Sequence, residues 1–315
     1  MKKVCVVGSL SYDLVMRVPR RPQKGETLIG TSFNTFVGGK GNNQALACAR
    51  SGASVHMIGR VGADSFGEQI ADKLTETGVN IDFLFRDKEL STGIADILID
   101  EDGDNSITIA PQANGRLSPA DIDAAKSAIQ QCNYMLLQLE IPLPTMVHAA
   151  KLGKQLGLTV VLNPAPAPVD GKLPDDLYSC LDLIIPNQTE AETLTGIKVN
   201  DIPSAVDAAK ALQAKGISQV IITMGEMGAI LVSGTGPAHM VPAFEIEVLD
   251  TTAAGDAFCG AMLAALARGE KLENAIIYGC AGGALATTCL GAEPSLPKAS
   301  EINKLVAARG EPCAS

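Results

Sequence analysis

The run Val4-Cys5-Val6-Val7-Gly8-Ser9 is a short, wholly apolar, β-branched stretch that ends in two small residues. Such a run is typical of a strand buried on both faces, as in a parallel sheet covered by helices. Similar runs recur along the chain, each followed by a polar or turn-forming residue. They are His56–Ile58 before Gly59, Tyr134–Leu139 before Glu140, Thr159–Leu162 before Asn163, Leu183–Ile185 before Pro186-Asn187, and Val220–Thr223 before Met224-Gly225.

Longer stretches with helical spacing separate these strands, at 42–51, 66–77, 118–131, 144–156, 205–215 and 254–268. Strand and helix in alternation predict an α/β fold with a mostly parallel sheet and helices on both faces. The residues that end the strands are then expected at one carboxyl edge of the sheet, where ligands bind in such folds.

Two segments, at about 12–37 and 93–110, break this alternation because neither contains a helix. The first holds the extended pieces 14–16 and 27–29, and the second resembles a hairpin that turns at 100–104. We expect a small separate sheet, inserted into a single domain that spans 1–315. An uncovered sheet must protect or use its edges, so this one is predicted to be a lid, a dimer surface, or both.

Composition excludes several classes of partner. The chain has 315 residues, a formal net charge of −10, 46% hydrophobic and 19% charged residues, which is a globular balance. Binding of nucleic acid needs a basic surface, and no Lys/Arg-rich run is present. No apolar run approaches the length of a membrane span, and the start of the chain lacks a secretory signal, so we expect a cytoplasmic protein without a membrane partner.

The eight cysteines, at 5, 48, 132, 180, 259, 280, 289 and 313, include no Cys-x-x-Cys pair, and most lie in apolar runs. We expect reduced thiols that pack as small hydrophobes. The three histidines are widely spaced and lack the spacing of metal ligands.

The strongest chemical motif is Asp250-Thr251-Thr252-Ala253-Ala254-Gly255-Asp256, which precedes a helical stretch. Small residues before a helix leave amide groups bare at the positive end of its dipole, which suits an anion such as a transferring phosphoryl group. Asp256 would lie in the first turn, where its carboxylate can take the proton of an attacking hydroxyl. The alternative is structural: Asp250 or one of the threonines caps the helix and Asp256 complements its dipole.

Three further motifs also allow two interpretations each. The first motif, Gly38 to Ala45, reads GGKGNNQA. Its glycines would allow the backbone to approach a ligand closely, with Lys40 and Asn43 binding sugar hydroxyls. The alternative is a flexible loop before a helix. The motif matches neither the phosphate loop nor the dinucleotide pattern. Asn187 and Glu190 either reach a phosphate-bound Mg²⁺ through water or form a capping box. Thr223 to Ala229 either lines a nucleotide pocket or is a hairpin turn.

In this order the motifs resemble the ribokinase (PfkB-type) carbohydrate kinase family, through signatures at 38–62 and 250–263 and the run Gln138-Leu139-Glu140. The resemblance extends from Val6 to Ser295. It implies a ribokinase-like three-layer αβα sandwich with a β lid that often forms a homodimer, and ATP-dependent phosphorylation of the 5-hydroxyl of a pentose, with D-ribose as the leading candidate. It also implies Mg²⁺ with ATP and activation by K⁺.

The resemblance implies a role for each matching residue. Asp256 is the general base, with Ala253, Ala254 and Gly255 as the anion hole. The sugar site is implied at Ser11, Asp13, Gly39, Lys40, Gly41, Asn43, Glu140 and Asp256. The ATP site is implied at Asn187, Glu190, Thr223, Gly225, Gly228, Gly255 and Cys280. The monovalent cation site is implied at Asp250, Thr252, Ala286, Cys289, Gly291 and Ser295.

Ser11 departs from the family, which usually has an asparagine there, and the shorter side chain loses one hydrogen-bonding arm toward the sugar. The substrate could therefore be 2-deoxyribose, another sugar or a nucleoside. A non-catalytic sugar-binding regulator on the same fold is the alternative outside enzymes. A nicotinamide oxidoreductase is disfavoured, because no dinucleotide glycine pattern follows Val4–Val7.

Overall fold

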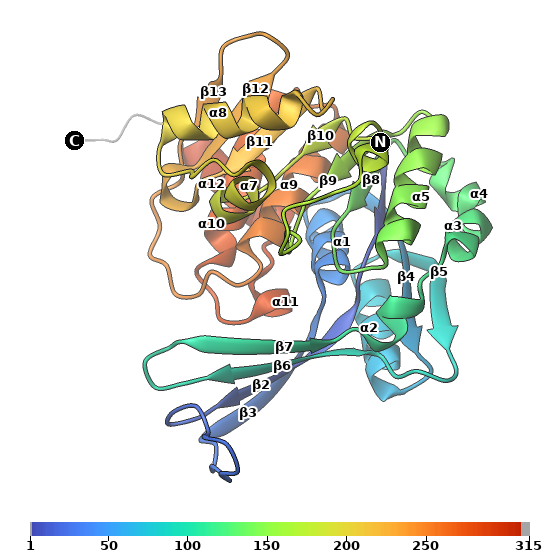
Figure 1. Cartoon of the computed structure of the whole chain (residues 1–315), viewed down its shortest axis with the longest axis vertical. Coiled ribbons are helices and arrows are strands. Elements are labelled where there is room, and N and C mark those ends of the chain that lie inside the picture. The colour runs from blue at the N-terminus through green and yellow to red at the C-terminus, as the bar shows by residue number, and fades with distance from the viewer. Residues whose placement is uncertain (1, 310–315) are drawn as a thin grey trace.

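The computed structural model describes residues 2–309, and within them a nine-stranded sheet forms the centre of the molecule (Figure 1). The strand order is β13-β12-β11-β10-β9-β8-β1-β4-β5. Neighbours from β11 to β5 are parallel, whereas β12 and β13 are antiparallel additions at one edge. The bounds are β1 Lys3–Val7, β4 Ser54–Gly62, β5 Asn80–Asp87, β8 Tyr134–Leu137, β9 Thr159–Leu162, β10 Leu183–Ile184, β11 Gln219–Thr223, β12 Ala229–Ser233 and β13 His239–Val241.

Helices cover both faces of this sheet, as the alternation of strand and helix predicts. Alternate residues of β1 enter different cores: Val4 and Val6 pack on one face, and Cys5 and Val7 on the other. The first face carries α1 (Lys40–Arg50), α2 (Ser65–Glu76), α9 (Ala254–Arg268) and α10 (Leu272–Ala286), with α12 (Ala299–Ala308) packed on α10. The second carries α3 (Pro119–Ala124), α4 (Lys126–Ile129), α5 (Leu143–Gln155), α6 (Asp175–Tyr178), α7 (Gln188–Thr195) and α8 (Ile202–Gln213).

Several boundaries differ from the predictions. The stretch 118–131 is divided into α3 and α4 at Ala125, and β4 continues past Gly59 to Gly62. The strands β5 and β13 and the helices α10 and α12 were not expected. The strand β5, Asn-Ile-Asp-Phe-Leu-Phe-Arg-Asp, carries too many polar residues to match a fully buried strand, because it lies at the edge of the sheet.

The two helix-free segments do form a second, four-stranded sheet in the order β3-β2-β6-β7, which extends away from the main sheet (Figure 1). Its strands are β2 Ser11–Arg17, β3 Ser32–Gly38, β6 Gly93–Ile99 and β7 Asn105–Ala110. The expected extended piece at 27–29 is not a strand, since β3 begins only at Ser32. Ile29, Phe33, Ile107 and Ile109 on or beside this sheet are each more than half exposed.

Six of the seven described cysteines are buried and all seven are free thiols, as expected, whereas Cys289 is exposed and Cys313 lies outside the described residues. Between residues 2 and 309, no helix combines the length and the hydropathy that crossing a bilayer requires.

The helices α1 and α9 approach each other more closely than side chains would allow. A Cβ placed on Gly260 of α9 would lie 2.3 Å from the Cβ of Ala47 and 2.7 Å from the backbone of Cys48, both on α1. Only glycine therefore permits this distance between the two helices.

We predict that Gly260→Ala lowers the free energy of unfolding by about 1–3 kcal/mol, because the added methyl group overpacks a contact with backbone. Chemical denaturation measures the change. Gly115→Ala is the matched control, since the nearest atom to its added Cβ is 3.9 Å away. Equal stability of the two variants would contradict this account of the helix contact.

Candidate active site

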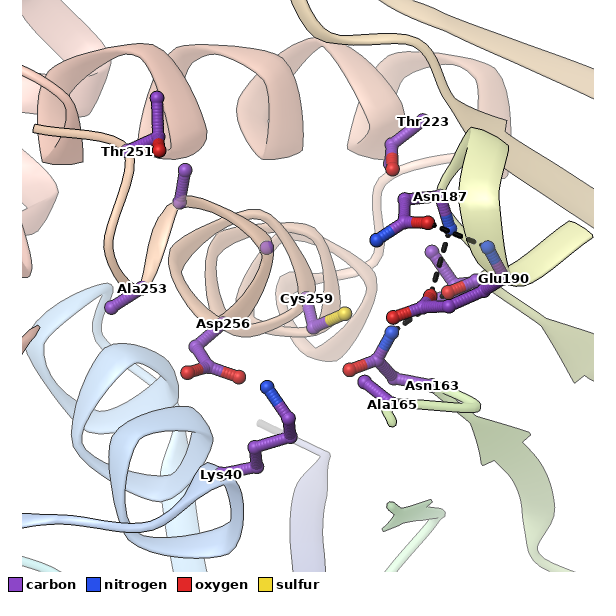
Figure 2. A pocket seen from close by; sticks show the side chains of 13 residues that line it. Lys40, Asn163, Ala165, Asn187, Glu190, Thr223, Thr251, Ala253, Asp256 and Cys259 are labelled. Carbon is purple, nitrogen blue, oxygen red and sulfur yellow. Dashed lines mark hydrogen bonds between the residues drawn. The ribbon is translucent and has the colours of Figure 1, made fainter. Parts of the chain in front are cut away.

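A cavity of about 180 Å³ opens at the carboxyl edge of the main sheet, beside the N-terminus of α9 (Figure 2). It is lined by strand-ending residues, by the start of α9 and by one side chain from α1. The lining residues are Lys40, Asn163, Ala165, Ile185, Asn187, Glu190, Thr223, Thr251, Ala253, Ala254, Gly255, Asp256 and Cys259. Eight of these residues were predicted for the site from the sequence.

The N-terminus of α9 carries no side-chain cap. Ala253 is the N-cap residue, in the left-handed conformation with φ 60° and ψ 7°, and no side chain between residues 2 and 309 caps the helix. The alternative that Asp250 or a threonine caps this helix is therefore wrong: Asp250 instead accepts from the amide and hydroxyl of Thr252. The Ala254 amide donates to the Thr251 carbonyl at 3.2 Å, but the amide of Gly255 has no such partner within residues 2–309. This amide and the positive end of the helix dipole lie at the cavity, where an anion can bind.

Asp256 lies in the first turn of α9 and is only 6% exposed. Its Oδ1 accepts from Gln44 Nε2 at 2.9 Å and its Oδ2 accepts from Asn43 Nδ2 at 3.2 Å. Burial raises the pKa of Asp256, while Lys40 and the two amide donors oppose that rise. Figure 2 shows the Lys40 ammonium pointing toward this carboxylate across the floor of the cavity.

The start of α1 and the end of β8 hold a second carboxylate nearby. Glu140 Oε2 accepts from Ser9 Oγ at 2.5 Å and from the backbone amide of Lys40 at 3.0 Å. Gly39, at φ 88°, turns the chain into α1 and lies against Leu10 and Ser11. Burial lowers the pKa of Lys40, but the charges of Asp256, Glu140 and Glu190 outweigh it and raise the pKa overall, so the ammonium stays charged.

Ser11 and Asp13 belong to β2, at the base of the small sheet. Ser11 Oγ donates to Asp13 Oδ1 at 3.0 Å, and Gly38 of β3 leaves the space that the Asp13 carboxylate fills. Burial raises the pKa of Asp13 to about 6, against the hydrogen bond from Ser11, and the nearby charges of Glu140 and Asp256 raise it further. The structure thus brings three carboxylates and Lys40 close enough for their charges to influence one another, which suits an alcohol with several hydroxyl groups. Of the four, only Lys40 and Asp256 line the cavity in the part of the chain that the structure describes.

The opposite wall is built from α7 and β11. Asn187 and Glu190 form a capping box, in which Asn187 Oδ1 accepts from the Glu190 amide and Glu190 Oε2 from the Asn187 amide. The Asn187 amide nitrogen remains directed into the cavity (Figure 2). Burial raises the pKa of Glu190. Thr223 ends β11, and Gly225 and Gly228 form the hairpin turn to β12; in the described chain these glycines do not line the cavity.

Cys280 lies inside α10, where burial raises the pKa of its thiol to about 12. Among the residues that the structure describes, it packs in the hydrophobic core and is not part of the cavity lining. The predicted place of Cys280 in the ATP site therefore stays a prediction.

The predicted cation-site residues meet in two adjacent loops. Asp250 Oδ2 accepts from the Gly291 amide at 2.9 Å, and the amides of Leu249 and Asp250 both donate to the Thr287 carbonyl. Ala286 ends α10, Cys289 follows it, and Ser295 ends α11 (Ala292–Ser295). Burial would raise the pKa of Asp250, but its hydrogen bonds from Thr252 and Gly291 lower it overall, so a carboxylate persists between these two loops. Such oxygen atoms fit a hard cation.

Five cavity residues and two buried partners were not among the predicted site residues. The five are Asn163, Ala165, Ile185, Thr251 and Cys259. Of these, Asn163 and Ile185 directly follow the strands β9 and β10, a position that signals the sheet edge. Gln44 and Ser9 lie within quoted motifs, but their partners Asp256 and Glu140 are 212 and 131 residues away. Periodicity cannot reveal such pairings.

Comparison with known proteins identifies relatives of the whole chain. The model of the pfkB family carbohydrate kinases matches residues 1–299. The ribokinase of Haemophilus influenzae is 40% identical over 300 residues, which is 95% of this chain and 97% of that protein. The deoxyribokinase of Salmonella typhi is 37% identical over 302 residues, 96% of this chain and 97% of that protein.

Solved structures give the same result for the fold. The structure of Arabidopsis thaliana ribokinase complexed with ribose and ATP superposes with a TM-score of 0.90 at 30% identity, and the match covers 97% of this chain and 98% of that one. The ribokinase-like αβα fold with a second, smaller sheet is confirmed. Because the family model and these relatives match nearly its full length, the chain belongs to the pfkB family of carbohydrate kinases.

Proposed function

We propose that this kinase transfers the γ-phosphoryl group of ATP to the 5-hydroxyl of D-ribose. The observation that carries the proposal is the buried carboxylate of Asp256 in the first turn of α9, beside amides that no side chain caps. The ribokinase relatives, at 36–40% identity, and the ribose and ATP in the related structure support the choice of substrates.

The reaction would be a direct in-line transfer. The sugar binds in the pocket formed by Lys40, Asn43, Glu140 and Asp13, with its 5-hydroxyl against Asp256. Asp256 takes the hydroxyl proton as the oxygen attacks, and the amides of 253–255 stabilise the charge on the transferring group. Positioning and charge stabilisation supply the rate enhancement, so no protein nucleophile is needed.

The ATP phosphates would lie between the start of α9 and the wall of Asn187, Thr223 and Glu190, with Gly225, Gly228 and Cys280 toward the base. Glu190 provides a carboxylate suited to Mg²⁺ through water, because one of its oxygens is engaged by the Asn187 amide and the other remains available. A bound Mg²⁺ would neutralise charge on the transferring phosphates.

A monovalent cation such as K⁺ would bind the loops at 250–252 and 286–295, which join the anion hole. Asp250, Thr252, Ala286, Cys289, Gly291 and Ser295 would supply the site, several through main-chain carbonyls. Its charge would support the amides of 253–255.

The four-stranded sheet would serve as a lid over the sugar and as the surface of a homodimer. Its exposed Ile29, Phe33, Ile107 and Ile109 support an interface between copies. A lid excludes water, which otherwise competes with the sugar as acceptor. The cytoplasm remains the expected location.

A second candidate substrate, 2-deoxyribose, is favoured by Ser11. Serine has no side-chain amide to extend toward the sugar, and the Ser11 hydroxyl donates to Asp13. The difference from the asparagine that is usual in the family thus removes a pairing on which discrimination between hydroxyl and hydrogen depends.

We predict that Asp256→Asn lowers kcat with ribose and Mg-ATP by about 10²–10⁴-fold, because the general base is lost. Release of ADP, measured by a coupled assay, gives the rate. Asp123→Asn, a change at an exposed carboxylate paired with His148, should leave the rate unchanged. Full activity of Asp256→Asn would refute the assigned base, and no activity of the unaltered protein with any sugar would refute the kinase.

We predict that Ser11→Asn increases the preference for ribose over 2-deoxyribose, expressed as the ratio of kcat/KM values, by roughly tenfold, the effect of one added hydrogen bond. Ser11→Ala is the control, since it removes the hydroxyl without adding an amide and should not raise the ratio. An unchanged ratio in Ser11→Asn would exclude this position from sugar discrimination.

We predict that K⁺ raises both the kinase activity and the midpoint of thermal unfolding, because an ion that binds only the folded state stabilises it. Choline chloride at equal ionic strength is the control. Asp250→Asn should lose both responses. The same K⁺ dependence in this variant and in the unaltered protein would place the cation elsewhere.

A further inference from the structure

Gln44 is wholly buried beneath the active site and does not line the cavity in the part of the chain that the structure describes. Its Nε2 donates to Asp256 Oδ1 at 2.9 Å and to Asn163 Oδ1 at 3.0 Å. Its Oε1 accepts from Gln138 Nε2 at 2.6 Å. The side chain therefore uses both of its N–H groups and its carbonyl within the protein, and has no direct access to a substrate.

The direction of these hydrogen bonds is determined by a backbone carbonyl. Asn163 Nδ2 donates to the carbonyl of Ile185 at 2.8 Å, and a carbonyl can only accept. The Oδ1 of Asn163 must then face Gln44 as an acceptor, so Gln44 must present its Nε2. Both amides are thereby held in one orientation, and a donor always faces Asp256.

The two oxygens of Asp256 consequently have different surroundings. Oδ1 is held by the buried Gln44, whereas Oδ2 is held by Asn43, a residue that we place in the sugar site. A sugar can exchange partners with Asn43 but cannot reach Gln44. One oxygen is thus anchored to the protein core, and the other is left to face the hydroxyl that loses its proton.

We propose that Gln44 is a positioning residue for Asp256, which fixes the orientation of the carboxylate and holds a hydrogen-bond donor against its Oδ1. The inference rests on the proposed role of Asp256 as general base. Asn163 completes the arrangement, because its fixed Oδ1 prevents the Gln44 amide from turning its carbonyl toward the carboxylate, and Gln138 donates to that carbonyl.

The titratable groups around Asp256 come from five elements or loops: Asp13 on β2, Lys40 on α1, Glu140 after β8, Glu190 on α7 and the thiol of Cys259 on α9, whose raised pKa keeps it neutral. None of these groups is altered by a change at Gln44. The hydrogen bond from Gln44 lowers the pKa of Asp256, so its loss should raise that pKa. An ionised base is required, and activity should therefore disappear at a higher pH than in the unaltered enzyme.

The test is Gln44→Met, which keeps the length of the side chain and removes both donors. We expect kcat to fall by about ten- to a hundredfold, the KM for ribose to change little, and the acid limb of the kcat/KM profile to move to higher pH. Asn114→Leu is the control: it also removes a buried amide with two hydrogen bonds, to Leu10, but it does not touch Asp256. The Asn114→Leu variant should be less stable, but the acid limb of its kcat/KM profile should stay at the same pH.

An unmoved acid limb and an unchanged kcat in Gln44→Met would overturn the inference, as would an equal shift in Asn114→Leu. If Gln44→Met does not fold, Gln138→Met replaces it. This variant frees the Gln44 carbonyl, and we expect a smaller shift in the same direction, whereas no shift would overturn the proposal. Asp256→Asn separates the two claims, because retained activity there refutes the base itself, independently of Gln44.

Discussion

A carboxylate that must remain ionised while it is almost completely buried is the constraint on which this site depends. Asp256 is removed from water at the mouth of α9, and desolvation favours its neutral form. Lys40 supplies a compensating charge, and Asn43 and Gln44 supply donors. All three compensating groups come from α1, so the separation of α1 and α9 governs the chemistry of the base.

The packing of the fold sets the distance between α1 and α9. Gly260 lets the backbones of the two helices approach, and the parallel strands end at one edge beneath them. The buried amides of Gln138, Gln44 and Asn163 then connect β8, α1 and β9 below the cavity. Unpaired buried amides are costly, and the pairing of Gln44 with Asn163 and Asp256 gives these groups a defined geometry, whereas the buried Oε1 of Gln138 has no partner among the described residues. The anion site needs less support, since the bare first turn of α9 provides its own donors.

Much of the fold follows from local patterns. Buried apolar runs with a polar ending predict parallel strands, and β9 and α9 begin and end where these patterns do. The edge strand β5 was not predicted because half of its residues are polar. The helix α10 was not predicted because its Ala- and Gly-rich sequence shows little difference in polarity between its faces. At the site, motif residues could be predicted one by one. The partner of Gln44 could not, since only the tertiary fold brings residues 44 and 256 together.

The wide spacing of these partners has a consequence for the order in which the protein matures on the ribosome. Residues 43 and 44 are synthesised early, but the carboxylate they bind belongs to residue 256. Until α9 has emerged, the apolar face of α1 that it covers stays open, and the buried amides lack their acceptor. A nascent chain that already contains every strand of the central sheet thus still exposes an apolar surface, and shielding by chaperones would matter most at that stage.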